Sequence, residues 1–372
     1  MPPLAVSLAG LAALAVGMGI GRFAFTPILP MMQAESALSL AAGGWLAAAN
    51  YAGYFAGALS APLLRSDRAI RAGLAAIGLA TLGMGLEHRL LAWLALRALA
   101  GVASAWVLIH VSAWCLERLA PLRRPMLNGA VYAGVGAGSA GAGVLCLALM
   151  QLQFESTQAW IALGLLALLA AVLLWPAFSG QHANRAPRTA YRWNGESARL
   201  VLCYAAFGFG YIVPATFIPA MAREALGDPA RFGWAWPIFG AAAAASTLAV
   251  SPLVRRIGNR GVWIAAHLVM AAGVAALLIL PGMPGILVSA LCVGATFMVI
   301  TMVGLQEGRR IAAGHAALMA AMTAGFAVGQ IAGPAFASLL IHAGGRLEHA
   351  LLVACVLLIA SACALIPRRT QA

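Results

Sequence analysis

The chain is divided into long apolar segments with little polar sequence between them. Hydrophobic residues make up 63% of its 372 residues and charged residues only 9%, against roughly a quarter charged in an ordinary soluble domain. A helix needs about 20 apolar residues to cross a bilayer, and twelve segments between positions 4 and 367 are long enough. The sequence therefore predicts an all-α membrane protein with twelve transmembrane helices and no sizeable soluble domain.

The arginines predict how these helices are oriented. All 23 basic residues are arginines, and with ten acidic residues they give a net charge of +13. Seventeen lie in the tail and in alternate loops, four lie in the opposite loops, and Arg22 and Arg97 lie within spans. The positive-inside bias then places both termini in the cytoplasm of a multi-pass protein of the bacterial inner (plasma) membrane. Because the arginines are scattered in small groups, no nucleic-acid partner is expected.

The cysteines and a glycine motif do not indicate a cofactor. Six cysteines are dispersed through apolar segments, without close pairs or Cys/His clusters, and are interpreted as small core residues. Gly136, Gly138 and Gly141 form a G-x-G-x-x-G pattern, but it lies inside an apolar run with no preceding strand. A dinucleotide site is therefore rejected, and neither a metal nor another cofactor is expected.

Part of the first span recurs half a chain later. The segment GIGRFAFTPILPMM aligns with GFGYIVPATFIPAM, 189 positions further on, with two glycines, a proline and a methionine in register. This parallel pseudo-repeat predicts two six-helix halves, residues 1–178 and 198–372. A cytoplasmic linker over residues 179–197 is expected to join them.

Several motifs resemble those of the major facilitator superfamily over nearly the whole chain. RSDRAIR (65–71) and RRIGNRG (255–261) resemble its loop 2/3 signature, and RALAGVASA (97–105) resembles its helix-4 signature. The opening GxGRFAxTPxLP and the helix-2 motif ANYxGYxxGA are similar to the YbfB/YjiJ-like branch. The resemblance implies a secondary transporter working by alternating access, with helices 1, 4, 7 and 10 lining a central cavity.

The glycine-rich helices are predicted to serve packing. GFAVGQIAGP (325–334) resembles an antiporter signature of the same superfamily, but it lies in helix 11, and its helix-5 counterpart GVGAGSAGAG lacks the proline. Small residues spaced one turn apart let neighbouring helices approach closely. The predicted packing residues are Gly134, Gly138, Gly325, Gly329, Gly333 and Pro334.

Arg22 and Arg97 are the residues that most strongly indicate a function. Both are expected near mid-membrane, where an arginine facing lipid costs ~2.5–3.5 kcal/mol, so both are expected to face water. Arg22 aligns with Tyr211 in the repeat and is therefore not part of the shared scaffold. Two guanidiniums at one depth would form a bidentate receptor for carboxylate, sulfonate or phosphate, which predicts an anionic substrate. The alternative is structural, with Arg97 bonded to backbone carbonyls and Arg22 paired with a distant acid.

Other polar residues within the spans are candidates for contacts with the substrate. The alternative for each is a hydrogen bond between helices or within its own helix. These candidates are Thr26, Asn50, Tyr54, Tyr204, Tyr211 and Gln330.

The acidic residues lie at helix ends or in loops. Proton-coupled carriers usually have an acid or a histidine within a span, so simple proton antiport is not favoured. At the cytoplasmic ends, ion pairs between the halves are predicted to close an inner gate, with isolated surface salt bridges as the alternative. The residues proposed for this gate are Asp67, Arg68, Arg71, Glu117, Arg123, Glu307 and Arg309.

The sequence is therefore interpreted as a monomeric carrier of a small organic anion, surrounded by membrane lipid. The main rival is a proton-linked exporter of amphipathic or cationic compounds, which two cavity arginines and the absence of a mid-membrane acid disfavour. A membrane-embedded enzyme would need clustered aspartates or a nucleophile with a base, and the acids here are scattered singly. No enzymatic activity is expected.

Overall fold

The computed structural model describes residues 1–36, 38–122, 124–179, 191–226, 234–313 and 315–366. Within these ranges every regular element is a helix, as the apolar segments predict. In the described part of the chain, ten helices are long and apolar enough to cross a membrane, and Trp236–Val250 is a shorter apolar helix. The elements are α1 Pro3–Leu14, η1 Ala15–Phe23, α2 Phe25–Ser36, α3 Leu40–Ser60, η2 Ala61–Leu63, α4 Ser66–Leu86, α5 Leu90–Leu119, η3 Ala120–Leu122, α6 Pro125–Gln151, α7 Ser156–Leu174, η4 Pro176–Phe178, α8 Gly195–Leu226, α10 Ala235–Val250, α11 Leu253–Ile279, α12 Met283–Ile311, α13 Ala316–His342 and α14 Leu347–Ala364.

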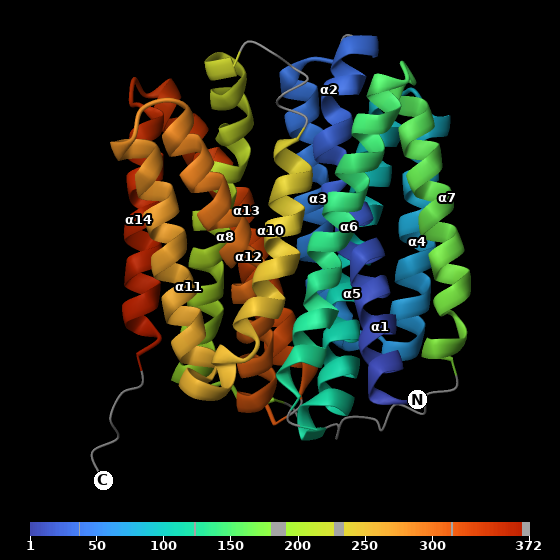
Figure 1. The fold of residues 1–372 in the computed structure, drawn as a ribbon, viewed down its shortest axis with the longest axis vertical. Coiled ribbons are helices and arrows are strands. Elements are labelled where there is room, and N and C mark those ends of the chain that lie inside the picture. Colours follow the sequence, from blue (N-terminus) through green and yellow to red (C-terminus); the bar gives the residue numbers. More distant parts are fainter. Residues whose placement is uncertain (37, 123, 180–190, 227–233, 314, 367–372) are drawn as a thin grey trace.

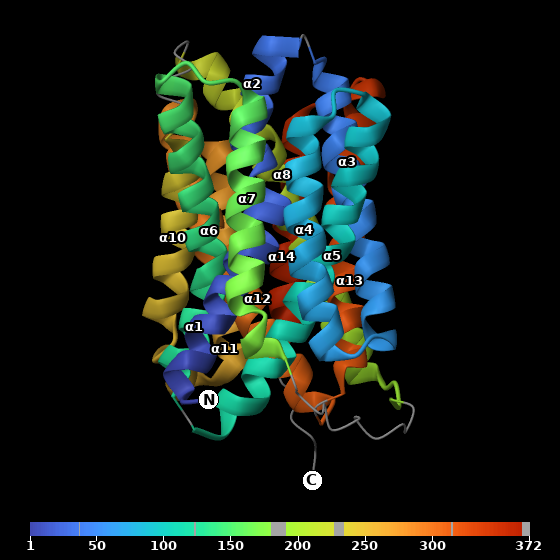
Figure 2. The same ribbon diagram turned by 90° about the vertical axis from the view of Figure 1, so that its right-hand side faces the viewer.

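The helices stand side by side along the long axis of the molecule (Figures 1 and 2). In Figure 1, α4 and α7 lie on the right, whereas α8, α11 and α14 lie on the left. We call α1 to α7 the N-terminal group and α8 to α14 the C-terminal group. The two groups meet where α6 packs against α10 and where α3 packs against α13. The chain enters α1 and leaves α14 at the same end of the bundle, called the terminal end below.

The first span changes helix type where it carries Arg22. Residues Ala15–Phe23 form a π-helix between α1 and α2, a geometry that is rare and frequent at functional sites. Glycines allow this segment to approach its neighbours. A Cβ atom on Gly19 would lie 2.6 Å from the Cα atom of Gly138 on α6, and one on Gly21 would lie 2.5 Å from the hydroxyl of Ser104 on α5. The segment is thus held close to α5 and α6.

Helices α6 and α13 also pack closely at the predicted glycines. A Cβ atom on Gly134 would lie 2.1 Å from the carbonyl oxygen of Leu11 on α1, and one on Gly329 would lie 2.2 Å from that of Ala205 on α8. Backbone-to-backbone contact of this kind requires glycine, because no side-chain movement relieves the clash. The other predicted packing residues lie on the same two helices: Gly138, Gly325, Gly333 and Pro334.

Candidate functional site

Arg22 lies at the junction of the two helix groups. Its side chain is buried, with 4% of the residue exposed. Its Nη2 donates a 2.6 Å hydrogen bond to Oε1 of Gln330 on α13, and its guanidinium carbon lies 3.9 Å from the ring centroid of Tyr54 on α3. A cation over an aromatic face gains electrostatic stabilisation. The structure thus brings together three residues that the sequence proposed separately.

The guanidinium of Arg22 retains unused donors. Among the described residues its Nε and Nη1 have no hydrogen-bond partner, and neither has Nε2 of Gln330. Glu35, the nearest acid along the chain, is engaged elsewhere. Its carboxylate accepts bonds from the backbone nitrogen (2.7 Å) and the hydroxyl (2.5 Å) of Ser156 at the start of α7. A buried cation with open donors and no described carboxylate partner is a costly arrangement, which an anion would relieve.

The guanidinium of Arg97, unlike that of Arg22, donates to backbone carbonyls of the first span. Its Nη1 donates to the carbonyl of Gly21 at 3.4 Å and its Nη2 to that of Arg22 at 3.3 Å, while its guanidinium lies 4.6 Å from the ring centroid of Phe25. Asn50 on α3 also donates to the carbonyl of Gly21 at 3.3 Å and to that of Arg97 at 3.0 Å. These bonds tie α3 and α5 to the π-helical segment, as the structural alternative for these two residues anticipated.

The surroundings of Arg22 include aromatic residues that the sequence did not single out. The ring centroids of Tyr51 and Phe326 lie 5.6 and 6.0 Å from its guanidinium carbon. Tyr51 also interacts electrostatically with Arg97, and the two arginines repel each other. The sequence could have identified Tyr51 as a candidate, because residues three apart on a helix share a face and Tyr54 was already a candidate.

The two tyrosines predicted from the C-terminal half lie in an aromatic cluster. Tyr211, on α8, stacks on Phe297 of α12 with ring centroids 4.5 Å apart and an interplanar angle of 17°. Tyr204 meets Trp263 of α11 edge to face at 5.9 Å. Phe23, next to Arg22, extends the cluster by an edge-to-face contact with Phe297 at 5.6 Å. The cluster forms an apolar wall beside the guanidinium.

Two hydroxyl residues near the arginines differ in their surroundings. Thr26 is half-buried on α2, one turn beyond Arg22. Ser104 donates to the carbonyl of Ala100 in its own helix at 2.7 Å. The Ser104 hydroxyl is therefore used within α5.

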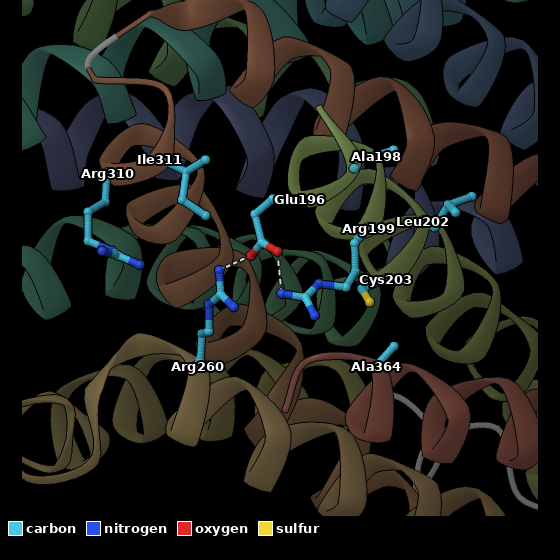
Figure 3. Close-up of a pocket in the computed structure, with 10 residues that line it drawn as sticks. Glu196, Ala198, Arg199, Leu202, Cys203, Arg260, Arg310, Ile311 and Ala364 are labelled. Atoms are coloured by element: carbon cyan, nitrogen blue, oxygen red, sulfur yellow. Dashed lines mark hydrogen bonds and ion pairs between the residues drawn. The ribbon is translucent and has the colours of Figure 1, made fainter. Parts of the chain in front are cut away.

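Ion pairs are concentrated at the terminal end. Figure 3 shows Glu196 between Arg199 and Arg260, both of which pair with it. Glu307, which is 2% exposed, accepts from Arg260 and from Arg310, each at 2.7 Å. These five residues belong to α8, α11 and α12, and four of them line a pocket of about 980 Å³.

This arrangement differs from the ion pairs expected between the halves. Glu307 pairs within the C-terminal group. Asp67 pairs with Arg65 at 3.4 Å and with Arg71 at 3.5 Å, at the start of α4, and Glu117 pairs with the adjacent Arg118 at 3.8 Å. These acids pair within their own helix group because each has an arginine within a few residues of it or on a helix packed beside it.

The remaining residues proposed for the gate have different positions. Arg309 on α12 interacts electrostatically with Glu117 on α5, so this attraction does cross between the groups. Arg68 is exposed on α4, and Arg123 lies outside the described residues. No group of three or more His, Cys, Asp or Glu able to hold a metal ion occurs in the described ranges.

Comparison with known proteins identifies the family. A family profile described as "Uncharacterised MFS-type transporter YbfB", where MFS denotes the major facilitator superfamily, matches residues 14–366. The chain belongs to this YbfB family of MFS transporters. No match was found among curated proteins.

Two solved structures share the fold of this YbfB-family protein. The human organic anion transporter MFSD10 (TETRAN) has a TM-score of 0.70 and 13% identity, covering 98% of this chain and 100% of that one. FucP, an MFS transporter in the outward conformation, has a TM-score of 0.74 and 14% identity, covering 98% of each chain. At such low identity the likeness concerns the fold alone.

Proposed function

We propose that this YbfB-family protein is a secondary transporter that carries a small organic anion across the bacterial inner membrane by alternating access. The observation that carries the proposal is the buried guanidinium of Arg22, with two unpartnered donor atoms and no carboxylate partner among the described residues. Carboxylates and sulfonates accept parallel N–H bonds from such a fork. The organic anion substrate named for MFSD10, which shares the fold, is compatible with this class.

Binding of the anion would alter the Arg22–Gln330 hydrogen bond, which links the two helix groups. A planar anion engages a guanidinium through Nη2 together with either Nε or Nη1. The Nη2 atom of Arg22 already donates to Gln330, so the anion would share or displace that amide. A substrate that weakens or replaces the hydrogen bond between η1 and α13 therefore changes the relative stability of the two states, in which the helix groups are rocked apart at one end or at the other.

The neighbouring residues have supporting roles in the proposal. Tyr54 covers one face of the guanidinium, and Thr26 is a further candidate contact. Arg97 and Asn50 position the π-helical segment, and Arg97 adds a second positive charge. Tyr204 and Tyr211 provide the aromatic wall for the apolar body of the substrate.

The proposed architecture completes this scheme. It consists of twelve spans in two pseudo-repeated halves, residues 1–178 and 198–372, with a linker over 179–197. The terminal end, which is rich in arginine, would face the cytoplasm, and attraction between Glu117 and Arg309 would favour closure of that end. The functional unit would be a monomer.

Uptake into proteoliposomes tests the substrate class. Purified protein would be assayed with radiolabelled monocarboxylates, dicarboxylates, sulfonates and a cationic dye. We expect uptake of at least one anion, which Arg22→Gln abolishes and Arg22→Lys reduces, because lysine keeps the charge without the planar fork. Arg256→Gln, which removes an exposed arginine on α11, serves as the matched control and should leave uptake unchanged. Full anion uptake by Arg22→Gln, or proton-driven export of the dye alone, would refute the proposal and favour the rival exporter.

A further inference from the structure

Phe23 makes two ring contacts that cross between the helix groups. It follows Arg22 in η1, and its ring centroid lies 5.6 Å from the guanidinium carbon. Its ring meets Phe297 of α12 edge to face, with centroids 5.6 Å apart, and meets Trp236 of α10 at 6.0 Å. In the proposed alternating access the helix groups move relative to each other, so both contacts would be broken during the cycle. A gap between aromatic rings would then open beside Arg22.

The rings that face Phe23 support one another within the C-terminal group. Phe297 stacks on Tyr211 at 4.5 Å and 17°, and Trp236 stacks on Phe239 at 5.1 Å and 14°. Phe239 also lies 6.2 Å from Phe297. We call these four residues the C-terminal wall. Because their mutual contacts lie within one group, a rigid-body motion of that group leaves the wall assembled.

The gap between Phe23 and the C-terminal wall favours an aromatic ligand. Rings in edge-to-face or offset-stacked geometry attract each other beyond the gain from burying their surface. Separation of the helix groups removes this attraction from Phe23, Phe297 and Trp236. A saturated hydrocarbon in the gap would restore only the burial, whereas an aryl group would restore the burial and the ring contacts.

The anionic group of such a ligand has one place to bind. Arg22 and Gln330 are 4% and 1% exposed, and Nε and Nη1 of the arginine and Nε2 of the amide lack partners among the described residues. Arg97 is the second cation nearby, but its Nη1 and Nη2 donate to the carbonyls of Gly21 and Arg22. The open fork therefore belongs to Arg22, at the end of the gap where Phe23 begins.

The far end of the gap is suited to a neutral group. The ring contacts of Phe297, Trp236 and Phe239 in the described ranges are with other aromatic residues. His267, at the edge of the cluster, uses both ring nitrogens, with the carbonyl of Trp263 at 3.1 Å and the hydroxyl of Ser361 at 3.2 Å. The indole N–H of Trp236 has no described partner, but it is neutral. A second carboxylate buried against this wall would lack a countercharge, which is costly.

We propose that the transported anion is an aromatic monocarboxylate, with its carboxylate on Arg22 and its ring between Phe23 and the C-terminal wall. The inference rests on the proposed anion-transport function and names the substrate class of that site. Arg22 then supplies most of the affinity, and Phe23, Phe297 and Trp236 determine the specificity. Aliphatic monocarboxylates and aromatic acids with a second charge opposite the first bind more weakly.

Three matched ligands test the substrate class. Benzoate, cyclohexanecarboxylate and terephthalate would each be titrated calorimetrically into the purified full-length protein in uncharged detergent. Benzoate and cyclohexanecarboxylate have the same charge and nearly the same size, so the ratio of their affinities reports the effect of aromaticity. We expect benzoate to bind roughly five-fold more tightly than cyclohexanecarboxylate. Terephthalate places a second carboxylate opposite the first and should bind roughly ten-fold or more weakly than benzoate.

Variants of the wall test the placement of the ring. Phe297→Leu and Trp236→Leu each remove a ring and keep an apolar side chain. Each should lower the affinity ratio of benzoate to cyclohexanecarboxylate by roughly two-fold or more, mainly through weaker binding of benzoate. Trp236 is half-buried, so its variant is the less sensitive to folding. The control is Phe178→Leu, which removes a buried ring that pairs with Trp114 inside the N-terminal group and should keep the wild-type ratio.

The outcomes separate this inference from the proposed function. Equal affinity for benzoate and cyclohexanecarboxylate, tighter binding of terephthalate, or an unchanged ratio in both wall variants at wild-type thermal stability overturns the inference. Proteoliposomes that take up aliphatic anions as well as benzoate, in an Arg22-dependent way, would overturn it and leave anion transport in place. Benzoate binding with the expected ratios but without uptake of any anion would refute the transport function and leave this binding site in place.

Discussion

The Nη2 atom of Arg22 lies 2.6 Å from Oε1 of Gln330, although 308 positions separate the two residues. The bond links the π-helical segment of the first span to α13, and hence the two helix groups. A neutral amide satisfies one donor without cancelling the positive charge. The charge of Arg22 therefore remains available to attract an anion. A carboxylate at position 330 would neutralise this charge.

The Gln330→Glu substitution tests this relationship. The new carboxylate would form a bidentate ion pair with Arg22 and compete with the transported anion. We expect anion uptake to fall at least ten-fold, mainly through a higher KM, while thermal stability is kept or raised because the buried charge gains a partner. Uptake kinetics and thermal unfolding of the same preparation provide the measurements.

The matched control is Gln330→Ala, which removes the amide without adding charge. It should lower stability by about 1 kcal/mol through the lost hydrogen bond and should affect uptake less than Gln330→Glu does. If both variants reduced uptake equally, the charge of Arg22 would not be what attracts the substrate.

Arg97 is predicted to act through position rather than through contact. The Arg97→Lys variant keeps a positive charge but cannot donate from a rigid fork to the carbonyls of Gly21 and Arg22. We expect a loss of about 1–3 kcal/mol in the free energy of unfolding, together with a several-fold fall in the rate of uptake. The KM should change less than it does in Arg22→Lys. An Arg97→Lys protein with wild-type stability and a strongly raised KM would show instead that Arg97 binds the anion directly.

The two arginines show what the sequence can and cannot predict. Their isolation within apolar spans indicated an unusual electrostatic role, because helix length and side-chain charge are local properties. Both were expected to face water, whereas the structure buries them, with Arg22 4% and Arg97 3% exposed. Which donors each uses depends on tertiary contacts. Arg97 meets carbonyls of the first span only because η1 packs against α5, and the pairing of Arg22 with Gln330 requires α13 to lie beside it.

The helix type and the ion pairs were less predictable for the same reason. The π-helix over Ala15–Phe23 was not predicted, because it depends on how Gly17, Gly19 and Gly21 pack against α5 and α6. The pairing of Glu307 with Arg260 depends on contact between α11 and α12. Charge counting along the chain can place an acid and an arginine at the same end of a bundle, but not on neighbouring helices.

The pair between Arg260 and Glu307 is expected to stabilise the C-terminal group. The Arg260→Gln variant leaves Glu307, which is 2% exposed, paired with Arg310 in the described part of the chain, and it removes one partner of Glu196. We expect a loss of roughly 1–3 kcal/mol in unfolding free energy, measured by chemical denaturation in detergent.

Helix packing offers a comparison within α6. A Cβ atom on Gly138 would lie 2.4 Å from the carbonyl oxygen of Ala15, whereas one on Gly141 would have no atom within 4 Å. Both substitutions by alanine gain about 1 kcal/mol of helix propensity. At position 138 the clash with backbone costs about 1–3 kcal/mol, and the first span must move away. Gly138→Ala should therefore lower the melting temperature and anion uptake, because η1 carries Arg22. Gly141→Ala should keep both at wild-type values or raise the melting temperature. Equal melting temperatures for the two variants would show that contact between η1 and α6 is not what holds Arg22 in place.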